Sequence, residues 1–118
     1  MTKQELELFE KQLQERGYNK QSAHNRADYA WMKSVGQSKY EESRCNYIII
    51  FSIYDFTKFN HAVNNPYSLQ PSILLSRTID ERYDLEITSH NVRYDIDKVE
   101  SLAESFLQWA EKNVEIYG

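Results

Sequence analysis

The pattern of hydrophobic and polar positions is densest over Cys45–Phe56, where both alternating sets of side chains are largely apolar. The β-branched and aromatic residues of this segment favour a strand. Apolar side chains on both sets indicate that neither face of the strand is fully exposed to water. The sequence therefore predicts a strand over Cys45–Phe56 whose second face must be covered by something.

A helix is predicted near the N-terminus, over residues 3–16. Thr2 and Glu5 fit a capping box, in which each side chain accepts a hydrogen bond from the other residue's backbone N–H. Gly17 stands where a left-handed cap would end the helix. Apolar residues recur at helical spacing between these signals, along a narrow stripe that would cover one side of a larger element. The stripe consists of Leu6, Phe9 and Leu13.

A second helix is predicted near the C-terminus. Either Asp95 or Asp97 can begin it, because a carboxylate at the cap accepts from the free N–H groups of the first turn. Leu107 and Trp109 broaden the apolar stripe of this helix. Its predicted inward residues are Val99, Leu102, Ala103, Phe106, Ala110 and Val114.

Three further segments alternate between apolar and polar residues, as strands do. They are 27–35, 72–79 and 83–88. The last alternates most cleanly, with Asp84 and Glu86 on its polar side, and it predicts a strand with one face in water. A helix over 20–33 is the alternative for the first segment, because its alanines tolerate helical structure.

These elements predict one α+β domain over residues 1–118, in the order α-β-β-β-β-α. We expect an antiparallel sheet of about four strands with both terminal helices packed on one face. Residues 18–26 are polar and lack a clear period. Residues 57–70 show no sustained pattern and are predicted to be a connection, although this segment is long for a connection in a compact domain.

Strand alternation divides the predicted sheet into two faces. The helix-facing set is large and apolar, whereas the opposite set is mostly small and polar with an apolar island. An exposed island of this kind is typical of a contact surface. The helix-facing set is Tyr29, Trp31, Val35, Tyr47, Ile49, Phe51, Ile53, Ile73, Leu75, Tyr83, Leu85 and Ile87. The island is Met32, Ile48, Ile50, Tyr54 and Leu74.

Composition and charge disfavour several classes of function. The 118 residues are 41% hydrophobic and carry a net charge of −4, which is unlike the basic excess of most nucleic-acid-binding domains. Nucleic-acid binding through Arg77, Arg82, Arg93 and Lys98 is the weakest alternative. No apolar run is long enough to span a membrane, and the charged first residues do not resemble a signal peptide, so we expect a cytoplasmic protein.

The residue types that carry chemistry are sparse or scattered. The three histidines lie far apart in the sequence and the single cysteine, Cys45, lies in the most apolar strand, so no metal-binding spacing is present. Only three glycines occur, which disfavours phosphate-binding loops and nucleophile elbows. We therefore expect no catalytic residues, no metal and no cofactor.

The leading hypothesis is a small non-enzymatic interaction or regulatory domain. It would pair with another protein, or with a second copy of itself, through the apolar island. The alternative is a domain, or a small enzyme, that binds a small molecule or an anion near the 57–70 connection. That site would be lined by His61, Tyr67 and Arg77.

Overall fold

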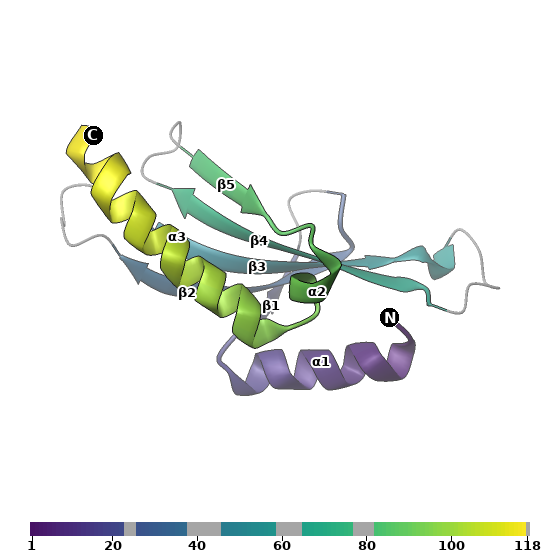
Figure 1. The fold of residues 1–118 in the computed structure, drawn as a ribbon. Coiled ribbons are helices and arrows are strands. Elements are labelled where there is room, and N and C mark those ends of the chain that lie inside the picture. The colour runs from purple at the N-terminus through teal and green to yellow at the C-terminus, as the bar shows by residue number, and fades with distance from the viewer. Residues whose placement is uncertain (23–25, 38–45, 59–64, 77–81, 118) are drawn as a thin grey trace.

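The computed structural model describes residues 1–22, 26–37, 46–58, 65–76 and 82–117. They form an antiparallel sheet in the order β1-β2-β3-β4-β5, with helices before and after it (Figure 1). This arrangement confirms the predicted α+β class. The elements are α1 (Lys3–Glu15), β1 (Asn19–Gln21), β2 (Tyr29–Gln37), β3 (Asn46–Asp55), the 3-10 turn η2 (Phe56–Lys58), β4 (Tyr67–Ser76), β5 (Arg82–Glu86), α2 (His90–Arg93) and α3 (Ile96–Tyr117).

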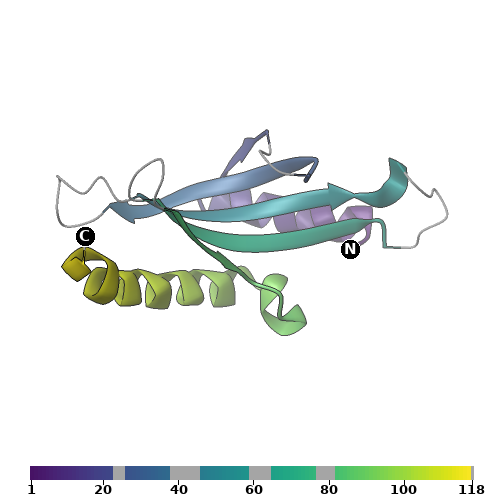
Figure 2. The same cartoon turned by 90° about the horizontal axis from the view of Figure 1, so that it is seen from above.

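Helices α1 and α3 bury the same set of strand side chains. The rings of Phe9 on α1 and of Tyr18 just after it pack edge-on against Phe51, at centroid distances of 5.6 and 5.5 Å. Val99 of α3 is buried in the same apolar cluster as Ile49 and Phe51. Figure 2 shows α3 and α2 on one side of the strands. We call this side the helix face of the sheet and the other side the open face.

The start of α1 follows the predicted capping box. The backbone N–H of Glu5 donates to Thr2 Oγ1, and the backbone N–H of Thr2 donates to Glu5 Oε1, each at 3.2 Å. These hydrogen bonds hold the pKa of the Glu5 carboxyl below its usual range. The inward stripe is confirmed, because Leu6, Phe9 and Leu13 are all buried.

The end of α1 is a Schellman motif. Gly17 has φ of 90°, and the backbone N–H groups of Gly17 and Tyr18 donate to Gln14 and Leu13 carbonyls at 3.1 and 3.0 Å. The reversal places Tyr18 over the sheet, where it is 2% exposed. The polar, aperiodic pattern of residues 18–26 gives no sign of this burial, because the burial follows from the cap rather than from a periodic pattern.

The predicted strands are confirmed over β2, β3, β4 and β5, with two corrections. The structure has a fifth strand, β1, within residues 18–26, where no element was predicted, and β4 begins at Tyr67 rather than at residue 72, within the predicted connection 57–70. Both segments take their conformation from a neighbour, since β1 pairs with β2 and the first half of β4 pairs with β3. The helical alternative for 20–33 is wrong for the same reason.

Pro71 is tolerated inside β4 because of where β5 ends. Its carbonyl accepts from the Ile87 N–H at 3.0 Å, just beyond the last paired residues of β5. In an antiparallel strand, the N and the C=O of one residue point toward the same neighbouring strand. The Pro71 nitrogen therefore points toward β5, and its lack of a hydrogen removes no hydrogen bond to β3. Further along the same edge, Arg93 Nε donates to the Leu69 carbonyl at 3.0 Å.

Helix α3 begins with Asp95, the earlier of the two predicted caps, whose Oδ1 accepts from the Lys98 N–H at 3.2 Å. Val99 and Ala103 are buried as predicted. Leu102 is 39% exposed, so its assignment to the inward stripe was wrong: the stripe is narrower, and Ile96 is buried instead. The side chains of Ala110 and Val114 lie outside those that the structure describes.

The helix-facing set is largely confirmed. Ile49, Phe51 and Ile53 are fully buried, and Trp31, Ile73 and Ile87 nearly so. Leu85 is the exception at 37% exposed, because β5 is an edge strand that has β4 on one side only. The described side chains do not include Val35, Tyr47, Leu75 and Tyr83.

Polar contacts join α1 to the sheet and join the end of α1 to α3. Glu10 of α1 accepts from Tyr29 Oη at 3.0 Å and from Trp31 Nε1 at 2.7 Å. At the far end of α1, Arg16 pairs with Asp97 of α3 at 2.7 Å, and Tyr18 Oη donates to Glu100 at 3.1 Å. Burial, with the neighbouring carboxylates, raises the pKa of both tyrosines.

Candidate functional site: the open face of the sheet

The strand register brings four of the five island residues together on the open face. Met32 of β2 lies directly opposite Ile50 of β3, and Ile48 of β3 lies opposite Leu74 of β4. Residues directly opposite on one face have Cβ atoms about 5 Å apart, and diagonal neighbours about 7 Å apart. Met32, Ile48, Ile50 and Leu74 therefore form one contiguous apolar cluster across three strands, which we call the open-face cluster.

Each member of the open-face cluster is partly exposed, in contrast to the residues behind it. Ile50 lies between Ile49 and Phe51 in the chain, and both of these are fully buried on the helix face. Small side chains surround the cluster, with Ser34 opposite Ile48 and Ser72 opposite Ile50. The cluster thus presents an apolar surface, bordered by serines, on the face of the sheet opposite α3.

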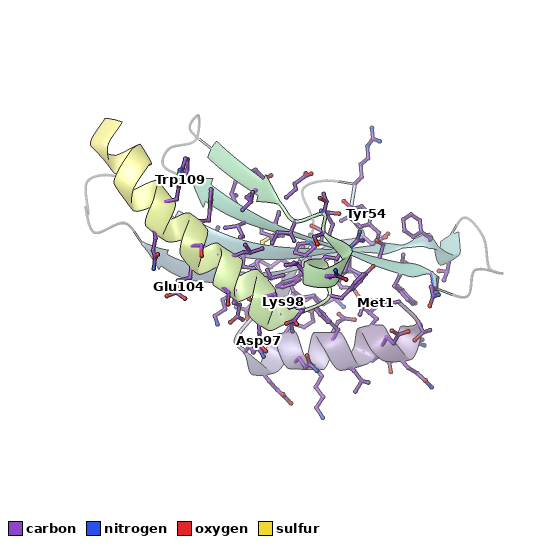
Figure 3. The ribbon with its side chains drawn as sticks, in the orientation of Figure 1. Met1, Tyr54, Asp97, Lys98, Glu104 and Trp109 are labelled. Carbon is purple, nitrogen blue, oxygen red and sulfur yellow. The ribbon has the colours of Figure 1, made fainter. Side chains whose placement is uncertain are left out.

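Tyr54, the fifth predicted residue, is on the same face but apart from the cluster. It lies four residues beyond Ile50 on β3, which is about 13 Å along a strand. Ser52, which is 4% exposed, lies between them. The Tyr54 ring stacks on Phe56 with a centroid distance of 6.4 Å. Figure 3 shows Tyr54 toward the β3–β4 hairpin, far from Trp109 at the other end of the molecule.

Two carboxylates border the cluster on β5. Asp84 lies opposite Leu74 and Glu86 lies opposite Ser72, and both side chains are exposed. Partial burial, together with the charge of Glu86, raises the pKa of the Asp84 carboxyl. Both carboxylates lie on the solvent-exposed side of the edge strand β5, as the alternation of residues 83–88 predicts.

A concave surface, separate from the open face, lies close to the 57–70 connection, where the alternative hypothesis expects a site. A groove of about 700 Å³ runs between α1 and the end of the β3–β4 hairpin. Tyr67 lines it, as predicted, whereas His61 and Arg77 lie outside the described residues. The other apolar residues that line it are Met1, Leu8, Phe9, Phe56 and Tyr94, and the polar residues that line it are Glu5, Gln12, Asn65 and Ser68.

Two of the four cationic residues named for nucleic-acid binding, Arg93 and Lys98, have described side chains, and both make contacts within the chain. Arg93 is held at the β4 edge, with Nη2 donating to Ser68 Oγ at 2.9 Å, while Lys98 reaches the Asn91 carbonyl at 3.4 Å. Arg77 and the side chain of Arg82 lie outside what is described.

The described residues contain no cluster of three or more histidine, cysteine, aspartate or glutamate side chains that could hold a metal ion. Within the same residues, no helix is long and apolar enough to cross a membrane. The chain matches no family model, no curated protein and no solved structure. Function is therefore inferred from the residues themselves.

The α1 wall of the groove is not predicted by the sequence, because the walls come from distant segments. Leu8, at 64% exposed, lies outside the apolar stripe of α1, and Phe56, at 43%, lies in η2 just after β3. No local pattern places these two residues in one groove, since its shape depends on how α1 lies against the end of the β3–β4 hairpin.

Proposed function

We propose that this protein is a non-enzymatic interaction domain that pairs with another protein, or with a second copy of itself, through the open face of its sheet. The observation that carries the proposal is the open-face cluster of Met32, Ile48, Ile50 and Leu74, which is contiguous in register and partly exposed. Contiguous exposed apolar surface of this kind is typical of protein contacts.

The open-face cluster is smaller than the area that a partner must cover in a stable complex. A stable protein interface covers about 800 Å² of each partner. Four partly exposed side chains supply only the centre of such an area, so the partner must also cover the neighbouring serines and the β5 edge. This matches the usual anatomy of an interface, in which an apolar centre is surrounded by a polar rim. Ser34, Ser72 and Glu86 would belong to that rim.

The experiment that tests the proposal is photo-crosslinking from the centre of the cluster, in the cells that make the protein. A photoreactive phenylalanine analogue replaces Ile50, and the same analogue replaces Gln14, which is exposed on α1, as the control. The proposal expects a discrete adduct from position 50 that position 14 does not give. An adduct of twice the 14.1 kDa chain mass would identify self-pairing, and another mass would identify a different protein.

A second substitution tests whether the adduct from position 50 forms through the open face. Ile48→Asp places a charge beside position 50, so the adduct should disappear if the open face is the contact. Equal adducts from positions 14 and 50, or an adduct that survives Ile48→Asp in a folded variant, would contradict the proposal.

That the protein is cytoplasmic stays a prediction from the sequence.

A further inference from the structure

We infer that the groove between α1 and the β3–β4 hairpin is a binding site for a small, uncharged molecule that carries both apolar and polar groups, separate from the open face. Its volume of about 700 Å³ lies within the range of small-molecule sites. Its position is close to the 57–70 connection, where the sequence predicts a ligand site, but its lining favours a different ligand class from the predicted anion.

Exposed apolar side chains from two elements line the groove. Leu8 of α1 is 64% exposed and Phe56 of η2 is 43% exposed, and both line it. Neither side chain is needed for the core, which packs on the opposite flank of α1 through Leu6 and Leu13. A ligand that covers these side chains removes their apolar surface from water, which favours binding.

The floor of the groove is held in place by contacts within the chain. Phe9 is 6% exposed and packs edge-on against Phe51. Met1 is joined to the first residue of β4, since its carbonyl accepts from the Tyr67 N–H at 3.1 Å and its ammonium donates to the Tyr67 carbonyl at 2.6 Å. Figure 3 shows Met1 below the hairpin. A site whose walls are already fixed loses little conformational entropy when a ligand binds.

The charges at the groove select against an ionic ligand. Among the described lining residues, the charged groups are the Met1 ammonium and the Glu5 carboxylate, which are of opposite sign. Arg93 stacks behind the Tyr94 ring, at 5.0 Å from its centroid, and its Nε and Nη2 already donate to Leu69 and Ser68. An ionic head would lose hydration without a net opposite charge to replace it. An uncharged ligand avoids this penalty.

Binding of the neutral dye Nile red tests the inference. We expect saturable binding of one dye per chain, with the affinity lowered at least tenfold by Leu8→Asp and by Phe56→Asp. Ile50→Asp, on the open face, is the matched control and should leave the affinity unchanged. Circular dichroism of each variant checks that the fold is kept, and Leu8→Gln provides an uncharged variant that should also weaken binding.

Competition against the dye tests the ligand class. Decanol, decanoate and decylammonium share one tail and differ in the charge of the head, and we expect decanol to displace the dye at the lowest concentration. Stronger displacement by either ion would overturn the assignment of an uncharged ligand. Absence of saturable dye binding would overturn the site itself, as would binding that Leu8→Asp leaves intact. Binding lost only in Ile50→Asp would overturn the groove and place the dye on the open face, in support of the proposed interaction surface.

Discussion

Ile50 and Phe51 are neighbours in the chain and lie on opposite faces of the sheet. Phe51 is fully buried beneath the rings of Phe9 and Tyr18, whereas Ile50 is partly exposed between Met32 and Ser72. One position along β3 thus separates the centre of the core from the centre of the proposed interaction surface, because successive strand side chains point to opposite faces.

Phe51→Ala tests the core side of this relationship. The substitution leaves a cavity where the two ring contacts meet, and we expect it to lower the free energy of unfolding by about 3–5 kcal/mol. Leu8→Ala removes a large apolar side chain at an exposed site and should change the same quantity by only about 0.5 kcal/mol. Urea unfolding of the two variants measures both. Equal losses would contradict the assignment of Phe51 to the core.

Glu10→Ala tests the polar attachment of α1 to β2. The variant leaves Tyr29 Oη and Trp31 Nε1, which donate to Glu10 at 3.0 and 2.7 Å, without their acceptor. Unpaired donors that are partly buried cost about 1–3 kcal/mol, so we expect a loss of stability of that order. Glu7→Ala, on the exposed side of α1, is the control. If thermal or urea unfolding shows the same loss of stability in both variants, the hydrogen bonds that Glu10 accepts do not stabilise the fold.

Gly17→Ala tests the cap that turns the chain from α1 to the sheet. Gly17 has φ of 90°, and no neighbouring atom lies within 4 Å of an added Cβ, so the effect is backbone strain without a steric clash. We expect a loss of about 1 kcal/mol in urea unfolding, and a smaller loss for Gly17→Asn. A neutral or stabilising Gly17→Ala would contradict the left-handed conformation.

Asp84→Asn gives a pH-dependent prediction. The pKa of Asp84 is raised in the folded state, chiefly by burial and then by Glu86, so its ionisation disfavours the folded chain. This cost is present above the folded-state pKa and vanishes as pH falls below the unfolded value. The variant should therefore raise the unfolding temperature slightly at pH 7 and leave it unchanged near about pH 3. An equal shift at both pH values would point to a cause other than titration.

Local patterns in the sequence predict much of the fold. The capping box at Thr2 and Glu5 sets the start of α1, and alternation over β2, β3 and β5 assigns their faces before any contact is known. Four of the five residues proposed for the interaction surface then follow from strand register alone. Tyr54 is misgrouped because alternation gives the face of a residue but not its distance from the others along the strand.

What the sequence does not predict depends on contacts between distant segments. The three residues of β1 are all exposed and have no apolar pattern, so they form a strand only because β2 lies beside them. The first half of β4 follows from its register with β3, in spite of Pro71. The groove requires Leu8 and Phe56 to approach from elements that are 48 positions apart in the numbering. These features arise from tertiary pairing, which no local pattern encodes.

The most direct test of the open face is the free energy of unfolding of Ile50→Asp, measured by urea denaturation at a chain concentration at which the unmodified protein is monomeric. If Ile50 lies at the centre of an open face, the charge stays in water and the loss should be about 1 kcal/mol, as expected from strand preference. A folded variant of near-normal stability would support the open face as a surface available to a partner. A loss of about 3 kcal/mol or more, or failure to fold, would place Ile50 in the core and contradict the proposed function.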